Sequence, residues 1–174
     1  MTAYRYFADA GAQIGAPVAS IFDFLDDQDN LSSHMRERSW MMMGSTMDIF
    51  MDDQRARAVG SRFGFTGRIL GIPLRVDEVV TERQPPIRKV WETTAEPTLW
   101  VIGRYEMGLE LSPAEQGSHL RVYIRYNLPI GWFPRLLGSA FGRAYARWCT
   151  AKMVSDAQRH FQGCASDRLR PMSS

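Results

Sequence analysis

Residues 99–128 read LWVIGRYEMGLELSPAEQGSHLRVYIRYNL, and residues 134–161 read PRLLGSAFGRAYARWCTAKMVSDAQRHF. The first stretch alternates apolar and polar side chains, a pattern typical of antiparallel strands with one buried and one solvated face. The second stretch places Leu137, Phe141 and Trp148 on one side of a single long helix, Pro134 to Phe161. A curved sheet closed by one C-terminal helix leaves space between the two layers, so the sequence predicts a ligand cavity there.

Upstream of these elements, the chain shows one strand, one or two short helices and then more strands. Tyr4–Ile14 reads as the first strand, and Pro17 suits the first position of a helix, where its missing N–H costs nothing. Asn30 or Ser32 could cap a short second helix. Further strands are expected over residues 39–51, 57–70, 74–80 and 87–94. This order predicts an α+β fold.

The chain length, charge and cysteine content restrict the classes of protein. The sequence of 174 residues predicts one domain over residues 1–163 and a polar, disordered tail over residues 164–174. A net charge of +2 is too small to indicate nucleic-acid binding. Cys149 and Cys164 predict neither a disulfide nor a metal site, and no cofactor motif is present. Because no leader and no spanning apolar run occurs, we expect a cytoplasmic protein without stable membrane insertion.

The segment APVASIFDFL (residues 16–25), together with the order of elements, resembles the START and Bet v 1-like helix-grip proteins of the SRPBCC superfamily. The resemblance extends from Tyr4 to Phe161. It implies a curved antiparallel sheet of about seven strands wrapped on a long C-terminal helix, with one or two short helices after the first strand. The superfamily includes lipid carriers, hormone receptors, polyketide cyclases/dehydratases, chaperone activators and oxygenase domains, so the fold alone does not choose a function.

Glu78 is the polar residue whose position is most informative. It shares strand parity with the apolar Leu74 and Val76, so it is expected to point inward with them. An ionised carboxylate is rarely buried without a partner, because its desolvation is costly. Glu78 is therefore either a ligand anchor or general base with a raised pKa, or a carboxylate at the sheet rim paired with an arginine such as Arg62 or Arg75.

Three further residues are candidates for ligand binding or proton transfer. Tyr105 and Tyr126 fall on the inward parity of adjacent strands, where a phenol either hydrogen-bonds a ligand or packs in the core. His34 is placed in the second helix near the expected cavity mouth, where it either transfers protons or is a solvated helix residue. No two histidines have the spacing of a metal site.

Methionines and aromatic residues complete the expected cavity. Methionine adapts to irregular shapes, so Met43 and Met107 would suit either a pocket for varied ligands or an irregular core. The apolar loop 128–134 is expected to fold back as a lid, with weak membrane contact as the alternative. Trp100 and Ile102, both placed on the outward face, are candidates for a homodimer contact. The predicted ligand-binding residues are Met43, Phe63, Phe65, Val76, Glu78, Tyr105, Met107, Tyr126, Phe141, Tyr145 and Trp148.

Three functions remain open at the level of the sequence. The first is binding of a small hydrophobic or amphipathic, lipid- or polyketide-like ligand between the sheet and the C-terminal helix. The second is an enzyme similar to polyketide cyclases and dehydratases, with Glu78, Tyr105 or His34 as acid or base. The third is a protein-interaction module whose cavity is filled by its own side chains.

Overall fold

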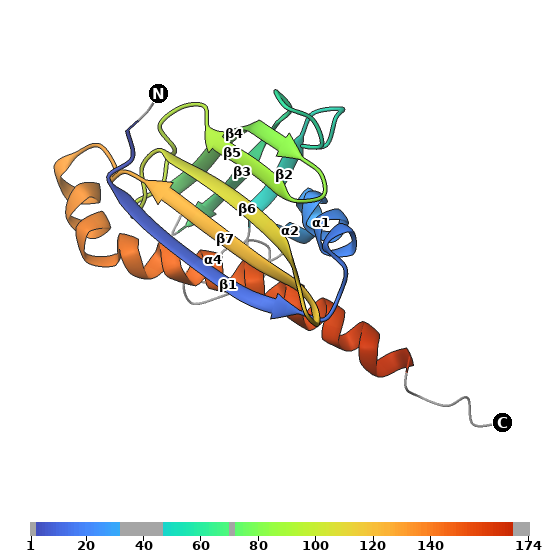
Figure 1. Cartoon of the computed structure of the whole chain (residues 1–174). Helices are drawn as coiled ribbons and strands as arrows, with labels where there is room; N and C mark the ends of the chain where they lie inside the picture. Colours follow the sequence, from blue (N-terminus) through green and yellow to red (C-terminus); the bar gives the residue numbers. More distant parts are fainter. Residues whose placement is uncertain (1–2, 32–46, 70–71, 169–174) are drawn as a thin grey trace.

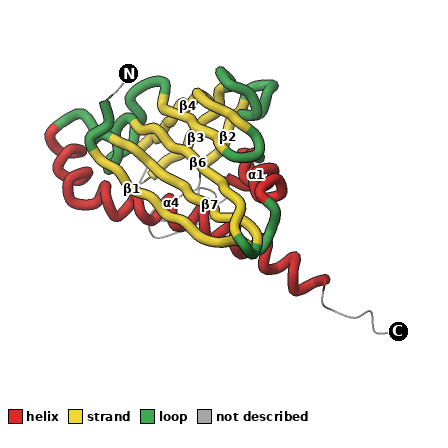
Figure 2. The backbone as a smooth tube through the Cα atoms, viewed as in Figure 1, coloured by secondary structure: helices red, strands yellow, loops and turns green. Residues whose placement is uncertain are grey.

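The computed structural model of the chain describes residues 3–31, 47–69 and 72–168 (Figure 1). Seven strands form one antiparallel sheet in the order β1-β7-β6-β5-β4-β3-β2. The helices are α1 (Val18–Asp26), α2 (Gln28–Leu31) and α4 (Trp132–Arg168), and α4 runs along one face of the curved sheet (Figures 1 and 2). The strands are β1 (Tyr6–Ile14), β2 (Met47–Met51), β3 (Arg62–Ile69), β4 (Ile72–Gln84), β5 (Arg88–Thr93), β6 (Tyr105–Ala114) and β7 (Gly117–Tyr126). The predicted α+β helix-grip fold is confirmed.

The alternating pattern of β6 and β7 fixes which face of the sheet meets α4. Met107 lies opposite Ile124 in the register, and both are buried on the concave face. Glu110 lies opposite Arg121 on the other face, where the two side chains form an ion pair at 3.3 Å. A shift of the register by one residue would bury these charges, so the sequence specifies the register strongly.

The segment before β6 differs from the prediction. Residues 99–104 form no strand, because β6 begins at Tyr105. Ile102, predicted to point outward, is 1% exposed and belongs to the core, so it cannot contribute to the predicted homodimer contact with Trp100. The prediction was wrong because the period of two was extended through Gly103, where the chain leaves the regular extended conformation.

Helix α4 is longer than predicted at both ends. It begins at Trp132 rather than at Pro134. Pro134 is tolerated there because the backbone N–H groups of the first helical turn have no partner within the helix. Ile130 is 77% and Trp132 82% exposed, so the expected lid of buried aromatics is wrong. At the other end α4 continues to Arg168, into the segment predicted to be a disordered tail.

The C-terminus of α1 is held on the sheet by a buried group of charges. Asp26 Oδ1 lies 3.0 Å from Lys89 Nζ, and Asp26 Oδ2 lies 2.8 Å from an Arg83 guanidinium nitrogen. Lys89, fully buried on β5, also donates to the carbonyl oxygen of Asp26 at 3.2 Å. Burial alone would raise the pKa of Asp26, but the hydrogen bond from Arg83 and the charge of Lys89 outweigh it and hold that pKa below its usual value. The two cations also offset the unfavourable position of an acid at a helix C-terminus.

Two glycines of α4 provide a test of how closely the helix packs. A Cβ at Gly142 would lie 2.7 Å from the carbonyl oxygen of Val101, whereas a Cβ at Gly163 would meet nothing within 4 Å. Gly142→Ala is therefore expected to lower the free energy of unfolding by about 1–3 kcal/mol despite the better helix propensity of alanine. Gly163→Ala, the matched control, is expected to raise it by up to about 1 kcal/mol. Denaturant unfolding measures both, and equal effects would contradict the close approach.

Candidate functional site: a cavity between the sheet and α4

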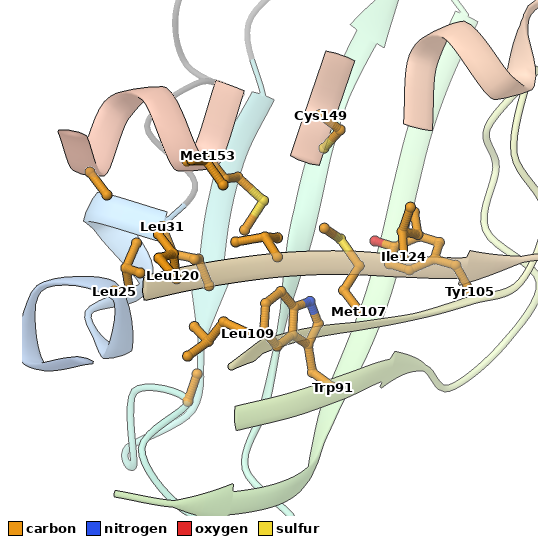
Figure 3. Packing of buried hydrophobic residues seen from close by; sticks show 14 of the residues in the cluster. Leu25, Leu31, Trp91, Tyr105, Met107, Leu109, Leu120, Ile124, Cys149 and Met153 are labelled. Atoms are coloured by element: carbon orange, nitrogen blue, oxygen red, sulfur yellow. The ribbon is translucent and has the colours of Figure 1, made fainter. Parts of the chain in front are cut away.

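A cavity of about 50 Å³ lies between the concave face of the sheet and α4. Side chains from the sheet, including Trp91, Met107 and Tyr105, point toward Cys149 and Met153 of α4 (Figure 3). The lining residues are Gln28, Leu31, Phe65, Val76, Glu78, Trp91, Leu99, Ile102, Tyr105, Met107, Ile124, Tyr145, Cys149 and Met153. Most of this lining is apolar, so the few polar groups in it decide what the cavity can recognise.

Glu78 lies in this lining and is 2% exposed. Strand β4 alternates Leu74, Val76 and Glu78 toward the core, which confirms the inward parity predicted for the carboxyl group. The predicted rim ion pair is wrong for Arg75, because its guanidinium binds Asp77 at 2.8 Å on the outer face. Arg62 is exposed and forms no ion pair with Glu78 either.

Tyr105, on β6, hydrogen-bonds one oxygen of the Glu78 carboxyl group, which lies on β4. The Tyr105 hydroxyl donates a hydrogen bond to Glu78 Oε1 at 2.8 Å, inside the protein. Glu78 Oε2 is buried and has no hydrogen-bond partner within the described part of the chain. A buried polar atom without a partner is uncommon in folded proteins and calls for a specific explanation. The indole N–H of Trp91 lies near enough to the carboxyl group to lower its pKa, but it makes no hydrogen bond of ordinary geometry to Oε2, so this oxygen can still bind a molecule in the cavity.

The burial of Glu78 changes its charge at neutral pH. Desolvation raises the pKa of Glu78 to about 8, although the hydrogen bond from Tyr105, the indole N–H of Trp91 and the charge of Lys89 all favour the ionised form. At neutral pH the side chain is therefore mainly a neutral carboxylic acid, which can donate a hydrogen bond as well as accept one. Burial and the nearby Glu78 raise the pKa of Tyr105 well above its ordinary value, so its hydroxyl stays protonated.

The cysteine in the cavity is held as a thiol. Burial raises the pKa of the Cys149 thiol to about 12, and the nearby Glu78 acts in the same direction. Since the thiolate is the reactive form, this thiol behaves as a small apolar group. The residues that the structure describes contain no group of three or more His, Cys, Asp or Glu side chains that could hold a metal ion.

The predicted ligand-binding residues fall into four groups. Tyr126 is buried but stacks on Tyr6 with ring centroids 5.4 Å apart instead of lining the cavity, and Phe63 is likewise core. Trp148 packs against Tyr145, whereas Phe141 is 57% exposed, so its predicted inward position is wrong. Met43 lies outside the described residues, as does His34, which was predicted as an acid/base candidate and not as a ligand-binding residue. The cavity is lined by the remaining six: Phe65, Val76, Glu78, Tyr105, Met107 and Tyr145.

Several lining residues were missed by the sequence analysis, and for some of them a signal existed. Tyr145, Cys149 and Met153 follow each other at intervals of four on α4, so the position of Tyr145 alone could have indicated the other two. Leu99 and Ile102 come from the irregular segment before β6, where no period predicts side-chain direction. The residues missed are Gln28, Leu31, Trp91, Leu99, Ile102, Ile124, Cys149 and Met153.

Sequence comparisons find no relative for this chain. No sequence model of a protein family matches it, and no curated protein matches it either. Solved structures do match over most of its length. A structure of Ara h 8.0201, a Bet v 1 homologue, superposes with a TM-score of 0.61 at 10% identity, over 91% of this chain and 98% of the other. The chain has the Bet v 1-like helix-grip fold.

Two further solved structures match this chain over most of its length. TTHA0849 from Thermus thermophilus matches with a TM-score of 0.63 at 17% identity, over 92% of this chain and 99% of that one. The di-domain ARO/CYC StfQ from the steffimycin biosynthetic pathway matches with a TM-score of 0.65 at 12% identity, over 92% of this chain. The match covers 52% of StfQ, so this chain corresponds in length to about half of that protein. At such identities the likeness shows the fold alone.

Proposed function

We propose that the protein binds a small, mostly apolar molecule carrying one uncharged oxygen in the cavity between the sheet and α4. The observation that carries this proposal is the carboxyl group of Glu78, buried in an apolar lining with Oε2 unpartnered in the described structure. A neutral acid in that position donates a hydrogen bond to a carbonyl, ether or hydroxyl oxygen of the ligand. It disfavours a carboxylate ligand, because two acids at close range oppose ionisation of either.

The size of the cavity restricts how such a ligand is accommodated. Apolar cavities of about 150 Å³ bind benzene, and the volume of about 50 Å³ seen here is much smaller. Met107 and Met153 line the cavity, and their unbranched side chains can change rotamer to enlarge it. A lipid- or polyketide-sized ligand would require α4 to move as well. We therefore expect a ligand of a few to about ten non-hydrogen atoms.

One observation favours a second candidate function, an acid/base enzyme resembling polyketide cyclases. A pKa of about 8 for Glu78 lies near neutrality, and the Tyr105 hydroxyl is 2.8 Å from its Oε1. General acids and bases work best when their pKa lies near the working pH. The match to StfQ is in keeping with such a role but concerns the fold.

The first experiment is native mass spectrometry of the purified protein, followed by solvent extraction and identification of what is released. We expect a small neutral molecule bound at about one per chain, held by apolar burial and one hydrogen bond. A clean mass both before and after incubation with neutral extracts would count against the binding function.

Two substitutions then separate binding from catalysis. Glu78→Leu removes the hydrogen bond to the ligand and is expected to weaken binding at least about tenfold. Glu78→Gln keeps a donor in place of the neutral acid, so we expect affinity to remain within about threefold of the unsubstituted protein. A binding protein returns the ligand unchanged in both cases. Conversion of the extracted molecule by the unsubstituted protein, abolished in Glu78→Gln, would instead establish the acid/base function.

A further inference from the structure

Five large apolar side chains are exposed around the start of α4. Ile130 precedes the helix, and Trp132, Phe133, Leu136 and Phe141 lie in its first turns. Their exposed fractions are 77%, 82%, 46%, 61% and 57%, in chain order. We call this group the α4 surface. Single exposed apolar residues are normal, but three of these are neighbours: Trp132 contacts Phe133 edge-on, with ring centroids 5.7 Å apart, and Leu136 follows Trp132 by one helical turn. Clustered exposed apolar side chains of this kind mark interaction sites.

Every charged side chain in residues 128–155 is positive. Residues 128–155 contain no aspartate or glutamate, whereas Arg135 and Arg143 lie exposed among the apolar residues. Neither arginine forms an ion pair with any residue that the structure describes, in contrast to Lys152, which is paired with Asp156 at 2.8 Å further along α4. The two guanidinium groups are therefore available to an anionic partner.

The α4 surface lies next to the wall of the cavity. Trp100 packs against Phe133 edge-on, with ring centroids 6.4 Å apart. Leu99 and Ile102, which come one residue before and two residues after Trp100, line the cavity. A partner seated on the α4 surface would therefore lie beside a segment that contributes to the cavity wall.

We propose that the α4 surface binds reversibly to an anionic lipid bilayer. Tryptophan and phenylalanine favour the membrane–water interface, and exposed arginines next to them add attraction to anionic headgroups. Trp132, Phe133 and Leu136 insert at the level of the headgroups, while Arg135 and Arg143 contact lipid phosphates. This contact involves one end of α4 only, and no described helix is long and apolar enough to cross a membrane. The proposal does not depend on whether the cavity is occupied.

Charge also distinguishes this partner from a second copy of the chain. A two-fold symmetric dimer brings the same patch of both subunits together. Arg135 and Arg143 would then approach the arginines of the other subunit, with no acid in residues 128–155 to balance them. A bilayer of zwitterionic lipid would not supply the complementary charge either. The composition of the patch therefore favours anionic lipid over both.

The test is cosedimentation of the full chain with vesicles, which needs no substitution for its first step. We expect binding to phosphatidylcholine vesicles containing about 30% phosphatidylglycerol to be at least about tenfold tighter than to phosphatidylcholine alone, and to weaken with added salt. Equal binding to both vesicles, or none to either, would overturn the proposal. A dimer that hides the surface, seen by light scattering and lost in Leu136→Ser, would overturn it as well.

Matched substitutions then locate the contact. Trp132→Ser and Arg135→Gln change side chains exposed on α4, so both variants should keep the thermal stability of the parent protein. We expect each to weaken binding to the anionic vesicles about fivefold or more. Ile87→Ser, which removes an apolar side chain 46% exposed in the turn before β5, is the control and should leave binding unchanged. Equal loss in all three variants would contradict the assigned position.

Discussion

Asp26→Asn is expected to lower the free energy of unfolding by about 3–5 kcal/mol, because it removes the negative charge that balances a fully buried ammonium. Lys89 has no exposed surface, and its positive charge is balanced by Asp26, whose Oδ1 lies 3.0 Å from Lys89 Nζ. Burial already lowers the pKa of Lys89, and the charge of Asp26 partly restores it. Without that charge, Lys89 must either stay charged in an apolar environment or lose its proton. Chemical denaturation near neutral pH measures the loss.

Two comparisons make this prediction specific. Asp29→Asn removes a carboxylate from the next turn, where Asp29 pairs with Arg55 and both side chains are at least 40% exposed, so a change below about 1 kcal/mol is expected. Adding Lys89→Met to Asp26→Asn should recover part of the lost stability, since the unbalanced charge is then absent. Equal effects of Asp26→Asn and Asp29→Asn would show that the buried group of charges does not hold α1.

Glu78→Gln is expected to remove a pH dependence of stability worth roughly 3–5 kcal/mol. The carboxyl group has an ordinary pKa of 4.5, and burial raises it to about 8 in the folded protein. Between these values the unfolded chain has released the proton and the folded chain retains it. The folded state therefore binds more protons, and its stability falls as the pH rises through this window. Below 4.5 and above about 8 this contribution no longer changes with pH.

The measurement is denaturant unfolding of both proteins at about pH 5, 7 and 9. Relative to the unsubstituted protein, Glu78→Gln should gain stability steadily toward the alkaline end. Asp77→Asn is the control. The Asp77 carboxylate is next to Glu78 in the chain but lies on the outer face with Arg75, and the hydrogen bond from Arg75 is the main cause that lowers the pKa of Asp77. Parallel pH profiles for the parent and Glu78→Gln would mean that Glu78 is ionised in the folded protein throughout.

The regular elements were predictable from the sequence because their periods are long and unbroken. β6 and β7 alternate without interruption from Tyr105 and Gly117 onward, and the inward direction of Glu78 followed from the same rule on β4. Prediction failed where the chain is irregular. The direction of Ile102 depends on how residues 99–104 pack against α4, and no local pattern records that packing.

The chemistry of the site was only partly predictable. Parity indicated that Glu78 points inward, but its partner could not be derived, since Tyr105 is 27 residues away and lies on β6, two strands from Glu78 on β4. The burial of Lys89 was likewise unexpected, because a lysine in a strand is ordinarily exposed and its partner Asp26 lies 63 residues earlier. Contacts of this range depend on tertiary packing, which a single sequence does not display.

The cavity is expected to accept a small apolar molecule with one oxygen, and the methionines in its lining can report such binding. The experiment records the methyl spectrum of ¹³C-methionine-labelled protein during titration with phenol and, separately, with toluene, which has no oxygen. We predict saturable shifts of the Met107 and Met153 methyl signals, little change at Met51 outside the cavity, and tighter binding of phenol than of toluene. Methyl signals of Met107 and Met153 that do not move up to the solubility limit of phenol would contradict the proposed binding function.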